Sequence, residues 1–285
     1  MNLKFIMMSS LLMGCSLFTS CAKEEAEDHK NALVDNTSIK MGSGVFSVST
    51  NKKVNFATGN VQYQPSSNTW RFAPTQYDAK LTDNEKRSDS AYNGWIDLFG
   101  WSSKANYYGV STSTNDADYV GVFEDWGKIF GDGWRTLTFA EWDYLLFNRT
   151  TSAGSYCFSW AEVNGMFGLI LFPDNYVNPD VECTYFDTKD NYLKLDYRKL
   201  NSFDLEKWAK LESAGVVFLP ASGYYGNDKY YDMGQAGDYW SSTLFEYDPK
   251  SSYALFFEEE DYFCSARCSK RFSTGGSIRL VNETK

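Results

Sequence analysis

Histidine is almost absent from this chain, which holds a single one, His29, among 285 residues. His29 lies in a polar stretch near the N-terminus, ahead of the segments with periodic apolar patterns. Ser-His-Asp and Cys-His catalysis and zinc binding by an HExxH motif all need histidine, so they are excluded from the main part of the chain. The glycine-rich signatures of phosphate-binding loops are also missing. These absences argue against an enzyme.

The sequence also lacks a stripe of basic residues. The chain has 27 Lys and Arg against 37 Asp and Glu, a formal net charge of −10. Such a chain repels phosphate backbones and anionic bilayers, so we expect no nucleic-acid partner. Residues 41–285 also contain no Pro- or Gly/Ser-rich linker and no repeat of fixed period, which favours one domain there.

The first twenty residues are mostly apolar. Lys4 precedes an apolar run from Phe5 to Phe18, which is too short and too rich in serine for a membrane span of ~20 apolar residues. This pattern predicts a secretory signal peptide over residues 1–20. The next residue, Cys21, resembles the acylated cysteine of a bacterial lipobox. Cys15 is the alternative lipidation site, and a plain signal with an incidental cysteine is the other interpretation.

An acidic segment follows this cysteine. Residues 23–28 resemble the export signal that sends lipoproteins of Bacteroides-type bacteria to the outer face of the outer membrane. The resemblance implies a palmitoylated, surface-exposed protein of the cell outer membrane, which touches the bilayer only through its lipid anchor. The polar composition of residues 21–40 also predicts a disordered tether, and the two interpretations are compatible.

Aromatic residues are abundant, at 18% of the chain. One interpretation is a β-rich core filled with aromatic rings, and the other is an aromatic ligand-binding face, since Tyr and Trp favour surfaces that are partly apolar and partly wet. Several tyrosines lie beside Asn and Asp in polar stretches, a composition suited to glycan or protein surfaces. These ligand-binding candidates are Tyr107, Tyr108, Tyr224, Tyr225, Tyr230, Tyr231 and Tyr247. We expect residues 223–232 to form a loop with partly exposed rings.

Short strands are predicted throughout the chain by alternating or continuous apolar patterns. The opening strands, expected as a meander, are 45–49, 54–56, 61–63 and 70–72. Residues 73–94 are polar and are expected to be loop. The later strands are 216–219, 253–257, 262–267 and 277–281.

Two helices are predicted. Thr138 and Glu141 form a capping box at the start of the first, whose inward face is Trp142, Leu145 and Leu146. The second runs over residues 203–212, and Gly215 follows its end. Its expected inward residues are Leu205, Trp208 and Ala209. Few helices, many short strands and long loops define an α+β class.

Three segments, in order along the chain, resemble the formylglycine-generating-enzyme-like domains, a branch of the C-type-lectin-like fold. They are residues 133–142, 238–243 and 276–281. With residues 216–223 they are similar to the Fibrobacter succinogenes major paralogous domain of surface lipoproteins, and residues 45–101 resemble the N-terminal part of longer such lipoproteins. The resemblance implies one C-type-lectin-like domain over residues 41–285, with an N-terminal strand extension, two main helices, short mostly antiparallel strands and long loops.

Several side chains of these segments also have structural explanations, which we favour. Trp134 and Trp142 are expected to pack a helix against the sheet. Arg135 and Arg279 are expected to form buried, charge-assisted bonds to carboxylates or carbonyls, because a buried charge needs a partner. Glu141 is expected to act as a helix cap.

Four cysteines remain after the predicted signal: Cys157, Cys183, Cys264 and Cys268. In an oxidising compartment an even number of cysteines suggests disulfides, and four cysteines can pair in three ways, none of which the sequence favours. In the formylglycine-generating enzymes a C-terminal cysteine pair carries a copper-dependent oxidation. Cys264 and Cys268 fall in the corresponding region, but three residues separate them where that enzyme has four. A copper-dependent cysteine oxidase is therefore the alternative function.

C-type lectins bind sugars through calcium, so a calcium site is a further candidate. One segment offers several side chains with oxygen ligands: Asp174, Asn178, Asp180, Glu182 and Asp187. The usual Trp-Asn-Asp ligands are replaced by Trp-Ser-Ser at residues 240–242, so we expect an acidic solvated loop and no metal or cofactor.

The expected function is therefore a non-enzymatic, surface-displayed lipoprotein that binds an extracellular glycan or protein. A diversified ligand-display protein is a related alternative.

Overall fold

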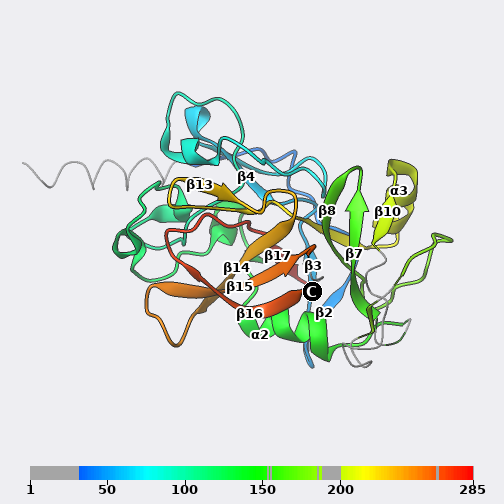
Figure 1. Ribbon diagram of the computed structural model, residues 1–285. Helices are drawn as coiled ribbons and strands as arrows, with labels where there is room; N and C mark the ends of the chain where they lie inside the picture. The colour runs from blue at the N-terminus through cyan, green and yellow to red at the C-terminus, as the bar shows by residue number, and fades with distance from the viewer. Residues whose placement is uncertain are drawn as a thin grey trace, which may run out of the picture. The chain divides into compact units, whose positions relative to one another are not determined.

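The computed structural model describes residues 32–152, 154, 156–184, 186–187, 200–260 and 263–284. The predicted signal peptide, both candidate lipidation sites and the acidic export segment lie outside the described residues. Ala32–Lys285 form one compact unit (Figure 1). Within the described residues this unit contains many short strands and two short α-helices, so the predicted α+β class is confirmed.

The first strands divide between two sheets. One sheet has the order β1-β5-β4, with β1 at Leu33–Val34, β4 at Val61–Gln64 and β5 at Thr69–Phe72. The other has the order β2-β3-β17-β6, with β2 at Phe46–Ser49, β3 at Lys52–Phe56, β6 at Trp134–Arg135 and β17 at Val281–Glu283. The four opening strands lie close to their predicted positions, but the predicted meander is wrong, because the strands belong to two different sheets. The C-terminal segment separates β3 from β4, because Leu280 accepts from the N–H of Ala57 and Ile278 from that of Val61.

A second half of the fold is built on the sheet β10-β7-β8-β11, with β9 also paired to β7. Its strands are β7 (Tyr156–Val163), β8 (Met166–Leu171), β9 (Phe186–Asp187), β10 (Asn201–Phe203) and β11 (Val217–Pro220). Helix α3 (Leu205–Ser213) is capped by the Asp204 carboxylate and buries Trp208 and Leu211. Leu205 is 50% exposed and Ala209 is exposed, so the predicted inward face was wrong at both.

The C-terminal region forms a hairpin and a three-stranded sheet. The hairpin pairs β12 (Tyr224–Gly226) with β13 (Lys229–Tyr231), and the sheet has the order β14-β15-β16. Its strands are β14 (Ala236–Leu244), β15 (Ser251–Glu258) and β16 (Cys264–Arg271). The strand predicted at residues 277–281 is shifted, since only β17 is regular there. Ser277 instead bonds to β14, donating its N–H to the Asp238 carbonyl at 2.7 Å.

Between β5 and β6 the chain is mostly irregular, as predicted for its first part. It contains short 3₁₀ turns, η3 (Asn84–Ser88), η4 (Tyr107–Gly109), η5 (Asp116–Tyr119) and η6 (Trp126–Ile129), and a further one, η2 (Pro65–Ser67), links β4 to β5. Aromatic rings from this region fill the interior. Six tryptophans are almost fully buried: Trp70, Trp101, Trp126, Trp142, Trp208 and Trp240. Most of the tryptophan content therefore serves the core.

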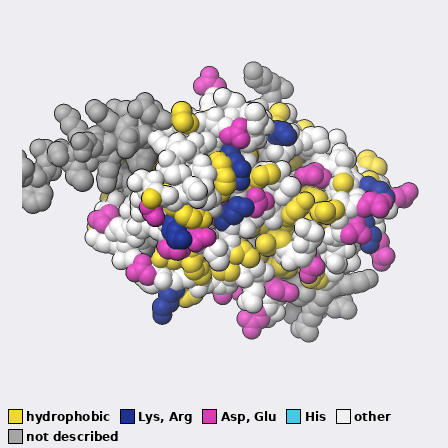
Figure 2. All heavy atoms as spheres, turned by 90° about the horizontal axis from the view of Figure 1, so that it is seen from above, with side chains coloured by type: hydrophobic (Ala, Val, Ile, Leu, Met, Phe, Trp, Pro, Cys, Tyr) yellow, Lys and Arg dark blue, Asp and Glu magenta, His cyan; other side chains and the backbone are white. Residues whose placement is uncertain are grey.

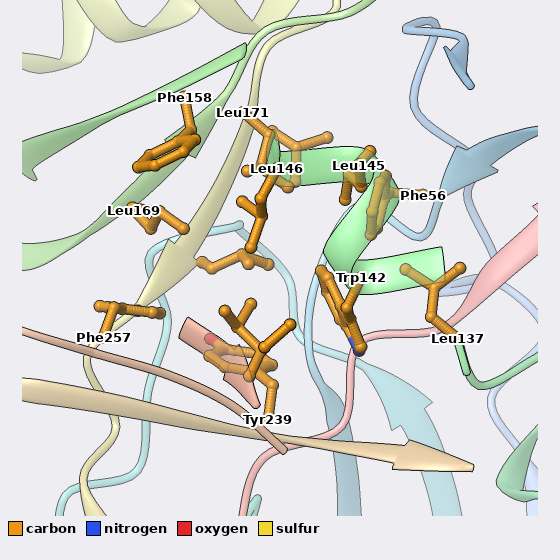
Figure 3. Packing of buried hydrophobic residues seen from close by; sticks show 14 of the residues in the cluster. Phe56, Leu137, Trp142, Leu145, Leu146, Phe158, Leu169, Leu171, Tyr239 and Phe257 are labelled. Atoms are coloured by element: carbon orange, nitrogen blue, oxygen red, sulfur yellow. The ribbon is translucent and has the colours of Figure 1, made fainter. Parts of the chain in front are cut away.

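Helix α2 (Phe139–Asp143) begins with the predicted capping box. The Thr138 hydroxyl accepts from the N–H of Glu141 at 3.2 Å, and the Glu141 carboxylate accepts from the N–H of Thr138 at 2.9 Å. A single π-turn, η7 (Tyr144–Asn148), continues the helix. Trp142, Leu145 and Leu146 point from α2 and η7 into a core that β3, β7, β8, β14 and β15 complete (Figure 3). The predicted inward face is confirmed.

Both arginines have the predicted kind of partner. Arg135 makes a bidentate pair with the Glu141 carboxylate, at 2.7 and 2.8 Å. Arg279 is 1% exposed and donates to the Asn60 and Gln76 side chains and to three main-chain carbonyls, those of Ala57, Gln76 and Phe218. Burial lowers the pKa of Arg279 to about 10. Arg279 thus joins the C-terminal segment to β11.

The cap of α2 gives a direct test of these contacts. We expect Thr138→Ala to lower the free energy of unfolding by ~1 kcal/mol, because the N–H of Glu141 loses its acceptor. Thr138→Ser keeps the hydroxyl and is the control. Urea unfolding of the two variants measures the difference, and equal stabilities would contradict the role of the cap.

Candidate ligand-binding surface

Residues 223–232 form a hairpin, so the predicted loop is wrong. Asn227 and Asp228 at its tip have φ of 49° and 58°, and positive φ at both central residues is characteristic of a type I′ turn. Tyr224 pairs with Tyr231, and Tyr225 pairs with Tyr230. Because side chains alternate along a strand, each tyrosine pair lies on its own side of the hairpin.

The pair Tyr225 and Tyr230 anchors the hairpin to η3. Tyr225 is 7% exposed and the Arg87 guanidinium lies 5.5 Å from its ring centroid. The Tyr230 hydroxyl donates to the Glu85 carboxylate. Burial, and then this carboxylate, raise the pKa of Tyr230. Tyr225 was expected to be partly exposed for a ligand, but it is buried in the fold.

The pair Tyr224 and Tyr231 lies on the other side and is half-buried. Their rings stack with centroids 4.9 Å apart and an interplanar angle of 10°. The Lys270 ammonium of β16 lies 3.9 Å from the Tyr224 ring centroid and 5.2 Å from that of Phe256 on β15. Phe263, which is 44% exposed, lies 6.2 Å from Phe256 between ring centroids.

We call these five residues, Tyr224, Tyr231, Phe256, Phe263 and Lys270, the hairpin surface. Figure 2 views the molecule from above the view of Figure 1. On that face, hydrophobic side chains reach the surface next to charged ones.

An ion pair underlies the hairpin surface. Lys270 contacts the carboxylate of Asp238 on β14, which is 1% exposed. Burial raises the pKa of Asp238. Burial lowers the pKa of Lys270, but the charge of Asp238 outweighs it and the net shift is upward. The contact between the two side chains fixes the lysine under the ring of Tyr224.

The other tyrosine candidates lie elsewhere. Tyr107 and Tyr108 are half-buried in η4, where the Tyr108 ring lies 5.7 Å from that of Trp70. Tyr247 is 79% exposed and ends a row of rings with Phe245, Tyr253 and Phe139. Tyr253 and Phe256 are three residues apart on β15, so this row and the hairpin surface face opposite sides of the sheet.

Sequence reasoning missed Phe256, Phe263 and Lys270. Phe256 lies in the apolar run 253–257, in which no polar residue marks the outward face. Its exposure depends on the partner strands, so periodicity carries no signal for it. The only sequence signal for Lys270 was the alternation of side chains along the predicted strand, which does not say which face of the sheet meets the hairpin.

The four cysteines form no disulfide in the structure. Cys264 pairs with Phe257 and Cys268 with Ala254, and directly opposed residues of paired strands share a face. Ala254 and Phe257 lie on opposite faces of β15, so the two thiols point to opposite sides of the sheet. The Cys157 thiol donates to the carbonyl of Arg149 at 3.0 Å. Burial raises the pKa of Cys264 and of Cys268, and raises that of Cys183 to about 12. The expected disulfides are therefore not found.

Two of the five candidate calcium ligands, Asp174 and Asn178, are used in structural bonds. The Asp174 carboxylate accepts from the Ser47 hydroxyl at 2.6 Å and from Arg149 at 3.2 Å. The Asn178 side chain bonds to the backbone of Val181. The side chain of Asp187 lies outside the described part. No group of three or more His, Cys, Asp or Glu that could hold a metal is found among the described residues.

Comparison with protein-family models, with curated proteins and with solved structures found no match to this chain. In the part of the chain that the structure describes, no helix has the length and apolar character needed to cross a bilayer.

The two sides of the hairpin should respond differently to mutation. We expect Tyr231→Ala to lower the free energy of unfolding by about 1 kcal/mol, chiefly through the lost ring stacking. Tyr225→Ala should cost ~3 kcal/mol or more, as buried aromatic truncations do. Thermal unfolding of both variants checks the order. A larger loss for Tyr231 would mean that the outer ring is a core residue.

Proposed function

We propose that this chain is a surface-displayed lipoprotein whose C-type-lectin-like domain binds an extracellular glycan or protein without catalysis. The observation that carries the proposal is the hairpin surface. Four aromatic side chains reach solvent around one lysine there, and three of them lie on strands that the fold holds in place.

Two properties of these rings support a binding role: aromatic rings are common at interfaces, and the rings here are already held in place before a partner binds. Tyr and Phe are enriched at the centre of protein interfaces, and stacked aromatic rings lose little conformational entropy on binding because they are already ordered. Tyr224 and Tyr231 are held by stacking, and Lys270 by its ion pair with Asp238. A partner would therefore meet a preorganised surface.

The C-type-lectin-like assignment is supported by how its three sequence segments meet. Ser277 of the closing segment bonds to Asp238 and Trp240 of the tryptophan strand. Val281, at its end, pairs with Arg135. Segments far apart in the sequence thus form one connected unit, as the resemblance implies.

The oxidase alternative gains no support from the cysteines. A copper ion held by two thiolates needs both sulfurs at one site. Cys264 and Cys268 face opposite sides of the sheet, and their raised pKa values favour the thiol form.

Binding is tested by probing glycan and protein arrays with the mature, acylated chain in detergent. We expect a ligand whose binding falls in Tyr231→Ala and persists in Val177→Ala, a change at an exposed site distant in sequence. The absence of any ligand, or equal binding by both variants, would contradict a binding role for the hairpin surface.

Anchoring is tested separately. We expect Cys21→Ala to release the protein from membranes, because the acyl chains that hold it would not be attached. Fractionation of cells that express either form measures this, with Cys15→Ala as the control. Release by Cys15→Ala alone would move the lipidation site to Cys15.

A further inference from the structure

We infer, on the basis of the proposed function, that the partner is a protein whose extended, acidic segment adds a strand to the free edge of β16. Strand β16 adjoins the hairpin surface, to which it contributes Lys270. A segment bound at this edge would therefore lie beside the exposed rings.

Strand β16 lies at the edge of its sheet. The order is β14-β15-β16, and among the described strands β16 pairs with β15 alone (Figure 1). Helix α2 packs on one face of this sheet, where Phe139 stacks on Tyr253 with ring centroids 4.3 Å apart. Ser269 and Arg271 of β16 are exposed. An exposed edge strand is a template on which another chain can form main-chain hydrogen bonds.

The register shows which main-chain groups of β16 are free. In an antiparallel pair, residues that bond to the neighbouring strand alternate with residues whose N–H and C=O point away from it. Phe272 donates its N–H to the carbonyl of Lys250 at 3.0 Å, and Arg271 and Ser269 are one and three positions away in the same register. Their main-chain groups therefore point outward. The Arg271 carbonyl accepts from Thr274 at 3.0 Å, but no bond to the Arg271 N–H or to either group of Ser269 is found on this side within the described residues.

A second copy of this chain is a poor occupant of the edge. Three of the eight residues of β16 are basic: Arg267, Lys270 and Arg271. Antiparallel pairing of two copies about Ser269 would place Arg267 of one copy opposite Arg271 of the other. Like charges directly opposite each other destabilise paired strands. The edge is therefore protected against self-pairing but open to a different strand.

Acidic residues of an added strand would lie beside two arginines. Arg267 and Arg271 flank Ser269 on one face, because side chains two residues apart share a face of a strand. Each contacts one carboxylate, Asp143 at 3.5 Å and Asp116 at 2.6 Å, and such pairs between exposed side chains are weak. A guanidinium has five N–H donors, so each arginine can hold a second carboxylate. The segment that fits has acidic residues four positions apart, with the residue midway between them opposite Ser269.

The net charge of the chain, −10, opposes an acidic partner at long range. At physiological salt, charges farther away than a Debye length of ~8 Å are largely screened. The arginines next to the bound strand therefore decide the preference, and binding should be measured at physiological salt.

Nine-residue peptides of Val and Thr, with Glu at the third and seventh positions, would test the inference on the full chain. Versions with Gln or Lys at these two positions change the charge, and we expect the affinity to fall in the order Glu, Gln, Lys. Two further Glu peptides are N-methylated on alternate amides, one at even and one at odd positions. Only one edge of an extended peptide can pair with β16, so one of the two should bind and the other should not. Fluorescence anisotropy of labelled peptides measures all five.

Matched variants of the chain locate the binding at the edge, with thermal unfolding to show that each is folded. Ser269→Pro removes an outward N–H and no bond to β15, and proline occurs on edge strands for this reason. It should weaken binding of the Glu peptide by about three- to tenfold, and by more than Ser269→Ala, which keeps the N–H. Arg267→Glu should narrow the difference between the Glu and Lys peptides. Lys207→Glu changes the net charge equally but lies on α3, and it should leave that difference unchanged.

Three results would overturn the inference: no binding of the Glu peptide, equal binding of the two N-methylated peptides, or equal affinities in Ser269→Pro and Ser269→Ala. A dimer of the chain that Ser269→Pro abolishes would also overturn it, because the edge would then belong to a second copy. These outcomes do not decide the proposed function. A glycan that binds the wild type and is lost in Tyr231→Ala would keep the binding role of the hairpin surface even if no peptide binds.

Discussion

Trp142→Ala is expected to lower the free energy of unfolding by ~3–5 kcal/mol, the usual cost of truncating a buried tryptophan. The Trp142 side chain is 1% exposed and projects from α2 into the core, where its ring lies 6.0 Å from that of Phe56 (Figure 3). Alanine would leave a cavity between the helix and β3. The measurement is urea unfolding at neutral pH, with unchanged m-values taken as evidence that the same structure unfolds.

Trp134→Ala is the matched control. The two tryptophans have the same role by sequence, as anchors of the helix, but Trp134 is only half-buried and contacts Phe72 at 4.9 Å between ring centroids. We therefore expect a smaller loss of stability than for Trp142. Equal losses would mean that Trp134 is also a core anchor. An unchanged stability in Trp142→Ala would place its side chain at the surface.

Asp97→Asn is expected to raise stability at neutral and alkaline pH. Asp97 is fully buried and accepts a hydrogen bond from the N–H of Lys80 at 2.7 Å. Its second oxygen has no hydrogen-bond partner among the described residues. Burial, and to a lesser degree the nearby Asp78, raise the pKa of Asp97 to about 7, although the bond from Lys80 lowers it. Asparagine keeps an acceptor for Lys80 and has no charge to bury.

The pH dependence follows from this raised pKa. The folded state holds the Asp97 proton more tightly than the unfolded chain, whose carboxyl titrates near 3.8. The stabilising effect of that proton is complete below pH ~4, and it is lost as the pH rises through about 7. The loss is at most about 4 kcal/mol, since each pKa unit corresponds to about 1.4 kcal/mol.

Unfolding free energies measured from pH 4 to pH 8 check the prediction, and carbon NMR of the Asp97 carboxyl follows its titration. Wild-type stability should decline over this range more steeply than that of Asp97→Asn. Glu206→Gln, at an exposed carboxylate, should reproduce the wild-type slope. If Asp97→Asn did so too, Asp97 would not be the group that titrates.

Only part of the hairpin surface could be predicted from the sequence. The composition of residues 223–232 identified the four tyrosines, because glycine, asparagine and aspartate beside them indicate a turn near the surface. Which pair faces out depends on the hairpin register and on η3, whose Glu85 and Arg87 lie far away in the sequence. Lys270 and Phe256 join the surface through pairing of β15 with β16, a contact that no local pattern encodes.

The sequence by itself determined the α+β class, the capped start of α2 and the inward face of Trp142, Leu145 and Leu146. These features depend on neighbours within a few residues, where capping bonds and the helical period act. Tertiary structure decided the division of the opening strands between two sheets, the opposite directions of Cys264 and Cys268, and the burial of Asp97. The first depends on strands paired across long sequence separations, since β17 pairs with β3. The second depends on the shifted register between β15 and β16, and the third on the packing of the loop that holds Lys80 and Asn84 around Asp97. Pairing, register and loop packing set which side chains lose contact with water.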